Sequence, residues 1–136
     1  MNYLLDTNVC IALINGASRK VRARLVQAIH GKASLTTSSI VAHELWYGVA
    51  KSERIPQNAN RLATFLGRDV VLLDYFESDA HAAGEIRAEL EQQGQRIGEY
   101  DTLIAGQAFS RNLILVTANT REFGRVKGLV VEDWSV

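Results

Sequence analysis

The chain has 136 residues, 47% of them hydrophobic, which is enough for one buried core, so we expect a single domain over residues 1–136. Fifteen basic and fifteen acidic side chains cancel, and the net charge therefore does not indicate a nucleic-acid partner. A lone cysteine excludes an internal disulfide, and Cys10 is expected to be a small core residue. There is no leader-like start and no apolar run of membrane-spanning length, which favours a cytosolic protein without a membrane contact.

Strand and helix signals alternate from the N-terminus onward. A short apolar run at residues 2–5 predicts a strand, and Asp6-Thr7-Asn8 after it are residue types that cap helices. Gly16 ends the short helix that follows, and Ser18 caps a second helix. The next predicted elements are a strand at 34–37, a helix at 40–52 capped by Ser38 and Ser39, and a helix opened by Pro56.

The second half of the chain repeats this alternation. Residues 69–73 contain four apolar residues in a row, as expected of a strand covered on both faces. The remaining predicted elements are a helix at 77–93 ended by Gly94, a helix at 102–112, a second buried strand at 113–116 and a last short strand at 129–132. The alternation predicts an α/β fold with a doubly wound, mostly parallel sheet flanked by helices on both faces.

Charge is unevenly distributed along the chain. Residues 1–73 carry nine of the basic and four of the acidic side chains, whereas residues 74–101 carry two and eight. The first half could therefore present a basic face, or these side chains could be ordinary solvated surface. The most concentrated basic group lies on one predicted helix and comprises Arg19, Lys20, Arg22 and Arg24.

Acidic or amide side chains recur where predicted strands end or just inside the following helices. Asp6 ends the first strand, Glu44 lies in the helix after the second, Asp101 opens a helix, and Asn119 follows the strand at 113–116. The carboxyl ends of parallel strands share one edge, so these residues should converge there. Clustered carboxylates repel one another unless a cation joins them. Oxygen-only clusters select hard divalent ions, and we expect Mg²⁺ or Mn²⁺ held against a phosphate.

Four sequence blocks resemble a known family, the PIN-domain toxins of the VapC type. The blocks are Asp6-Thr7-Asn8 and residues 39–45, 100–105 and 116–123, and they occur in the family's order and spacing across essentially the whole chain. The resemblance implies a PIN domain with Mg²⁺- or Mn²⁺-dependent endoribonuclease activity, acting as the toxin of a type II toxin–antitoxin pair. Transfer RNA, notably the anticodon stem-loop of initiator transfer RNA, is the favoured substrate.

The resemblance also implies partners. It implies a cognate VapB-type antitoxin that blocks the site, and contact with operator DNA only through the antitoxin complex. We further expect a homodimer. Trp46 and Tyr47 could take part in packing or in the dimer interface, or they could stack on RNA bases.

Each candidate site residue has an expected role. Asp6 and Asp101 are the expected metal ligands, and the helix dipole should help to keep Asp101 ionised at neutral pH. Glu44 is expected either to bind the metal directly or to orient the groups that bind it. Thr7, Asn8 and Thr117 are candidates for orienting the carboxylates. Simpler roles are helix capping for Asp6 and Asp101, and a surface ion pair with Lys51 or another basic residue for Glu44.

Two positions depart from the family pattern. Many relatives have Asp near position 119, whereas this chain has Asn119, and Glu122 one turn later could supply the fourth acid. Alternatively, Asn119 is only a turn residue and Glu122 only the N-terminal acid of a helix. Glu99 stands where close relatives often have Pro, and it either faces water or weakens phosphate binding by repulsion.

Three other functions fit the sequence less well. A metal-free ribonuclease would need two cooperating histidines, but His30, His43 and His81 fall on separate predicted helices. A phosphoacceptor receiver domain could use Asp74 after the strand at 69–73, but the chain lacks an acidic pair after the first strand and a Lys-Pro after the last. A catalytically inactive PIN-like binding module should have lost the acids, which are present.

Overall fold

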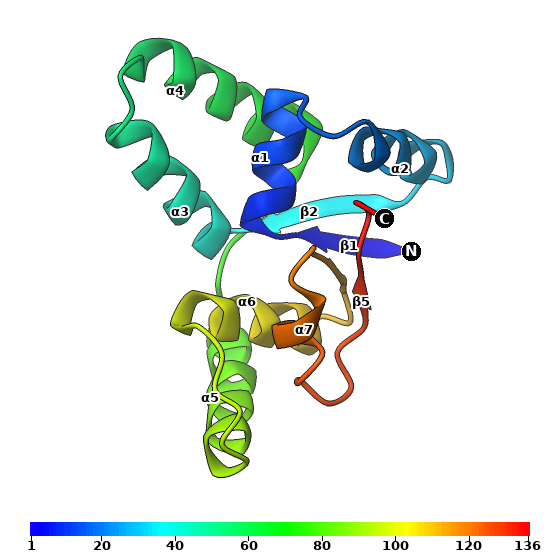
Figure 1. Cartoon of the computed structure of the whole chain (residues 1–136), viewed down its shortest axis with the longest axis vertical. Coiled ribbons are helices and arrows are strands. Elements are labelled where there is room, and N and C mark those ends of the chain that lie inside the picture. Colours follow the sequence, from blue (N-terminus) through cyan, green and yellow to red (C-terminus); the bar gives the residue numbers. More distant parts are fainter.

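The computed structural model describes all 136 residues and contains one five-stranded sheet with strand order β3-β2-β1-β4-β5 (Figure 1). Every pair of neighbouring strands is parallel. The strands are β1 (Asn2–Leu5), β2 (Ser34–Ser38), β3 (Val71–Leu73), β4 (Ile114–Val116) and β5 (Val131–Glu132). The predicted doubly wound sheet is confirmed, and it is parallel throughout.

Helices cover both faces of the sheet (Figure 1). One face carries α1 (Thr7–Asn15), α2 (Arg19–His30), α3 (Ser39–Ala50) and α4 (Ile55–Thr64). Helix α4 continues directly into a short π-helix, η1 (Phe65–Asp69). The other face carries α5 (Glu77–Gln92), α6 (Glu99–Ser110) and α7 (Thr120–Phe123). None of these helices combines the length and apolar character needed to cross a membrane. The chain adds β2 and then β3 on one side of β1, and it adds β4 and then β5 on the other side. The topological switch point of the sheet therefore lies between β1 and β4.

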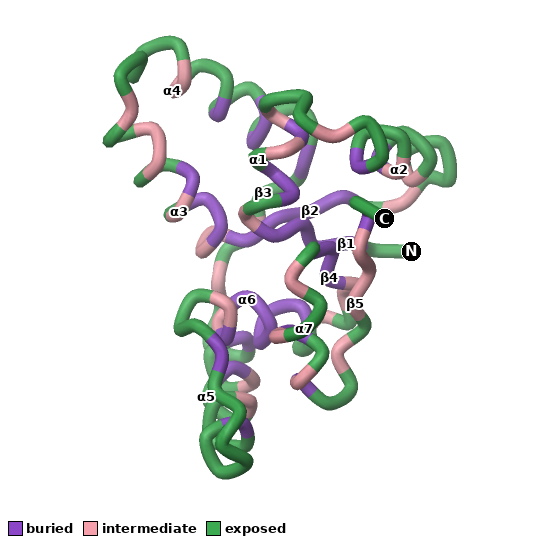
Figure 2. Tube along the Cα trace, viewed as in Figure 1, coloured by how far each residue is buried: buried purple, intermediate pink, exposed green.

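The core is built around the central strand β1 and its neighbours (Figure 2). Leu4 and Leu5 of β1 are completely buried, as are Leu115 and Val116 of β4. Cys10 is also completely buried, as predicted, and burial raises the pKa of its thiol to about 12. Its thiol is therefore protonated at neutral pH and is a packing group.

The prediction that the strand at 69–73 is covered on both faces is wrong. Strand β3 comprises only Val71–Leu73 and lies at the edge of the sheet, where it pairs with β2 alone. Val71 is 58% exposed and Leu72 is 41% exposed, whereas Val70 before the strand is buried. An apolar run does not reveal strand order, and strand order decides how much of a strand its neighbours cover.

Helix α6 begins at Glu99, three residues earlier than predicted. Asp101 therefore lies within the first helical turn instead of in front of it. Helix α6 packs very closely on α5, because a Cβ at Gly106 would lie 2.5 Å from the Cβ of Ala83. Only glycine fits this contact, and the contact helps to fix the helix that carries Asp101.

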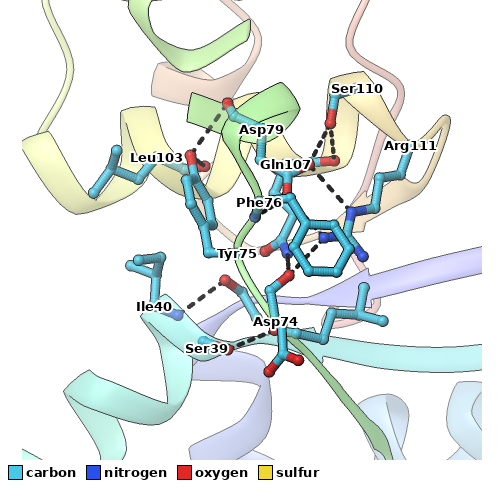
Figure 3. A network of polar contacts seen from close by, with 12 residues as sticks. Ser39, Ile40, Asp74, Tyr75, Phe76, Asp79, Leu103, Gln107, Ser110 and Arg111 are labelled. Atoms are coloured by element: carbon cyan, nitrogen blue, oxygen red, sulfur yellow. Dashed lines mark hydrogen bonds and ion pairs between the residues drawn. The ribbon is translucent and has the colours of Figure 1, made fainter. Parts of the chain in front are cut away.

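A polar network centred on Asp79 also holds α6 in place (Figure 3). Asp79 is completely buried and accepts hydrogen bonds from the Phe76 amide at 2.8 Å, from Arg111 Nη2 at 2.7 Å and from the Ser110 hydroxyl. Arg111 also donates to the carbonyl of Asp74, just after β3. The network therefore joins α5 and α6 to the end of the edge strand.

Candidate active site

Four acidic side chains lie near one another at the carboxyl edge of the sheet, beside the switch point between β1 and β4. Asp6 follows β1, and Glu44, Asp101 and Glu122 come from α3, α6 and α7. The negative charges of Glu122, Glu44 and Asp6 all raise the pKa of Asp101, so the four groups interact. The structure thus places the four acids that the sequence singled out within range of one another's charges.

Asp6 lies almost fully buried, at 6% exposed, between β1 and α1. Its Oδ1 accepts a 3.0 Å hydrogen bond from the Val9 amide and so caps α1. Burial raises the pKa of Asp6, and the nearby charge of Glu44 raises it further. Hydrogen bonds from Thr117 and from the Val9 and Asn8 amides favour the charged form but do not cancel that increase. Asp6 is therefore a helix cap, as the simpler alternative held, that also faces a negative cluster.

Asp101 has the most perturbed pKa of the cluster. Burial raises the pKa of this carboxyl to about 6, with further contributions from Glu122, Glu44 and Asp6. The charged form still predominates at neutral pH, as expected. The favourable position in the first turn of α6 nevertheless does not compensate for burial and for three neighbouring negative charges.

Glu44 is oriented by Thr7. The Thr7 hydroxyl donates to Glu44 Oε1 at 3.0 Å and links the start of α1 to α3. Glu44 belongs to no ion pair, so the alternative of a surface pair with Lys51 is wrong. Asn8 has an exposed side chain, and only its amide contributes to the environment of Asp6.

Glu122 is oriented by Asn119. The Asn119 side-chain amide donates to Glu122 Oε2 at 2.6 Å, and the Asn119 backbone amide donates to the Thr117 hydroxyl at 3.0 Å. Asn119 thus lies just before α7 and holds the acid three residues later. Glu99 instead lines a cavity between α5 and α6 together with Arg87 and Arg96.

The donor set of the cluster suits a hard divalent cation, because it offers only carboxylate oxygens and carries excess negative charge. All five ion pairs of the chain lie elsewhere, so no basic side chain neutralises these acids. No three acidic, histidine or cysteine side chains are yet arranged closely enough to hold one ion. Closure around a cation would therefore require side-chain rotation, which the long Glu44 and Glu122 side chains allow.

The histidines do not form a catalytic pair. His81 pairs with Glu85 on α5, and His30 ends α2. His43 instead contacts Tyr100, with its Nε2 3.3 Å from the phenol oxygen. Sequence reasoning did not identify this pair, although His43 directly precedes Glu44 and Tyr100 directly precedes Asp101.

Two members of the basic group on α2 are engaged within the chain. Arg22 donates to the Leu13 carbonyl at the end of α1 at 3.2 Å. Arg24 forms a 3.1 Å ion pair with Glu132 and lies over the Trp134 ring. These contacts favour a structural role for Arg22 and Arg24 over RNA binding.

Comparison with known proteins identifies the class. Residues 3–129 match the PIN domain family. The chain is 44% identical over 135 residues to the tRNA(fMet)-specific endonuclease VapC of Shigella flexneri, covering 99% of each protein. It is 40% identical over 134 residues to ribonuclease VapC2 of Rickettsia felis, covering 98% of each.

Solved structures agree with this class. VapBC2 from Rickettsia felis bound to a promoter DNA fragment gives a TM-score of 0.91 at 40% identity, covering 98% of this chain and 99% of that one. DNA-bound VapBC from Salmonella typhimurium gives 0.89 at 39% identity, covering 98% of each chain. The chain belongs to the PIN-domain family, in its VapC branch. The receiver-domain alternative is therefore wrong.

Proposed function

We propose that the chain is a metal-dependent endoribonuclease and the toxin of a type II toxin–antitoxin pair, which inhibits translation by cleaving transfer RNA. The observation that carries this proposal is the presence of four mutually repelling acids without a basic partner at the switch point of a PIN fold. The similarity to a tRNA(fMet)-specific endonuclease supports initiator transfer RNA, cut in its anticodon stem-loop, as the substrate.

In the proposed mechanism, Asp6 and Asp101 would hold Mg²⁺ or Mn²⁺, and Glu44 and Glu122 would complete the site. When bound, the ion lowers the pKa of a water molecule and offsets the negative charge that develops on the phosphate. The Val9 amide fixes Asp6, and the Thr7 hydroxyl and Asn119 amide orient Glu44 and Glu122. The contact with Val9 fixes Asp6 before RNA arrives, whereas Glu44 and Glu122 would rotate away from these contacts to complete the site around the ion.

The test is cleavage of purified initiator and elongator transfer RNAs. Initiator transfer RNA should be cut in its anticodon stem-loop, EDTA should stop cleavage, and Mn²⁺ should restore it. Activity that persists in EDTA would contradict the metal mechanism. Equal cutting of all transfer RNAs would contradict the substrate assignment alone.

The cognate antitoxin is proposed to block the same acids. A groove of about 280 Å³ between α1, α3 and α4 has Glu44 and Arg61 on its wall, and half of its lining residues are apolar: Ile11, Ile14, Leu45, Val49 and Leu62. An amphipathic antitoxin helix would fit such a groove. An arginine from this VapB-type partner would pair with the acids and displace the metal. Operator DNA would be bound only through the complex.

Alanine substitution of each basic residue in the antitoxin tail tests this form of inhibition. One such change should restore cleavage while the antitoxin stays bound through its helix. If no single change relieves inhibition, the antitoxin blocks the RNA path sterically and does not mimic the metal.

A further inference from the structure

His43 and Tyr100 form an exposed aromatic pair beside the acid cluster. Their ring centroids are 5.5 Å apart and their planes are tilted by 51°. Tyr100 is 49% exposed, and the hydrogen bond between the two side chains is exposed as well. The contact joins α3 to α6, and each residue directly precedes a cluster acid in the chain, Glu44 or Asp101.

The aromatic surface continues along α3. Trp46 and Tyr47 follow His43 by three and four residues, so the three side chains share one side of the helix. Trp46 is 41% exposed and Tyr47 is 61% exposed. One turn later, the Lys51 ammonium lies 4.7 Å from the centroid of the Tyr47 ring. We call this surface the aromatic strip, and it comprises Tyr100, His43, Trp46, Tyr47 and Lys51.

The aromatic strip is separate from the core and from most of the apolar groove. The buried side of α3 is formed by Val41, Ala42 and Leu45. The groove proposed for the antitoxin uses Leu45 and Val49 of this helix. Internal packing therefore does not account for the exposed rings of the strip.

The chemistry of the strip matches unpaired nucleotides. Its aromatic side chains offer ring faces on which bases can stack, and each has a polar tip. Lys51 forms no ion pair and is available to a phosphate. The strip contains no acid, and two of its members directly precede the cluster acids Glu44 and Asp101 on the same helices.

We propose that the aromatic strip binds the unpaired nucleotides next to the scissile phosphate, with bases stacked on its rings and a phosphate held by Lys51. This inference rests on the proposed ribonuclease function and assigns the face over which the RNA passes. Only unstacked bases can lie on such rings, so the strip selects a loop over a paired stem.

The test uses an Asp6→Asn protein, which should bind RNA without cutting it, and a fluorescent anticodon-loop oligonucleotide. Tyr47→Leu and Tyr100→Leu should each weaken binding about tenfold, whereas Tyr47→Phe and Tyr100→Phe should keep most of the affinity. Phe109→Leu is the matched control, because Phe109 is an exposed aromatic at the far end of α6. Lys51→Gln should lower the dependence of log affinity on log salt by about one unit.

Trp46 provides a second readout. Bound RNA should quench its fluorescence, whereas Trp134, at 1% exposed, should be unaffected. Leucine variants that bind RNA as the parent does would overturn the inference. Leucine variants that lose only self-association, measured by light scattering, would also overturn it and assign the strip to a second copy of the chain. Either result leaves the ribonuclease proposal standing, because only the cleavage assay tests that proposal.

Discussion

Two aspartates in this protein are almost equally buried and yet have opposite pKa shifts. Asp79, between α5 and α6, has no exposed surface, and Asp6, at the end of β1, is 6% exposed. Burial raises the pKa of both, but hydrogen bonds from Arg111, Ser110 and the Phe76 amide outweigh it at Asp79 and lower the pKa there. At Asp6 the pKa stays raised.

The difference lies in the partners that the chain provides. Asp79 has a cation, Arg111, at 2.7 Å, and its charge is fully compensated inside the fold. Asp6 has only uncharged donors, and its charged neighbour is another acid, Glu44. We infer that Asp79 stabilises the fold, whereas the cluster around Asp6 is completed by something that the chain does not contain. Substitutions of the two groups should therefore have opposite consequences.

The largest expected effect is on activity. Asp6→Asn keeps the shape of the side chain and removes its charge, and it should reduce RNA cleavage by about a thousandfold. It should not lower the melting temperature measured in EDTA, because it relieves repulsion in the cluster. A folded Asp6→Asn protein that cuts RNA at the parent rate would contradict the proposed metal site.

At Asp79 the largest effect should be on stability. Asp79→Asn should lower the free energy of unfolding by about 3 kcal/mol, because it leaves Arg111 without its counter-charge. The native pKa of Asp79 is lowered, so this stabilisation is complete above the ordinary Asp pKa and is lost as pH falls through the native value. Urea denaturation at several pH values measures it. Glu85→Gln, in the exposed His81–Glu85 pair, is the control and should change stability little.

Substitutions of Glu122 and Asn119 should lower the cleavage rate less than Asp6→Asn does, and by different amounts. Glu122→Gln should lower cleavage about tenfold if Glu122 is the fourth acid of the site. Asn119→Ala should have a weaker effect, because Asn119 acts through its hydrogen bond to Glu122. Steady-state cleavage rates at saturating Mn²⁺ make the comparison. The reverse ranking would show that the Asn119 amide is the ligand.

The smallest expected effect is an increase in stability. Asp101→Asn should stabilise the protein in EDTA at neutral pH by about 1 kcal/mol. The gain is limited because solvent screens part of the repulsion at this half-buried group. The pKa of Asp101 is about 6 in the folded chain and lower in the unfolded chain, so its charge destabilises the fold increasingly as pH rises between these values. The advantage of the variant should therefore disappear below about pH 4. If Asp101→Asn were more stable than the parent by the same amount at every pH, the added stability would not come from removal of the charge.

The sequence predicts much of this arrangement because the relevant signals are local. Asp6 follows an apolar strand directly, and Asn119 and Glu122 are three residues apart at the start of a short helix. Relationships set by tertiary packing were not predictable. The exposure of Val71 depends on strand order, and Asp79 meets Arg111, 32 residues later, only because Gly106 lets α5 and α6 approach closely. The contact of His43 with Tyr100 likewise depends on how α3 and α6 face each other.

The most direct test of the central claim is the melting temperature of the protein as Mn²⁺ is added. An ion that binds only the folded state at a hundred times its dissociation constant should stabilise it by about 2.7 kcal/mol. If the acid cluster binds the ion, the increase should occur in the parent chain and in Glu85→Gln and should be lost in Asp6→Asn and Asp101→Asn. Equal stabilisation of Asp6→Asn and the parent chain, or none in the parent with either Mn²⁺ or Mg²⁺, would contradict the claim that the cluster is a metal site.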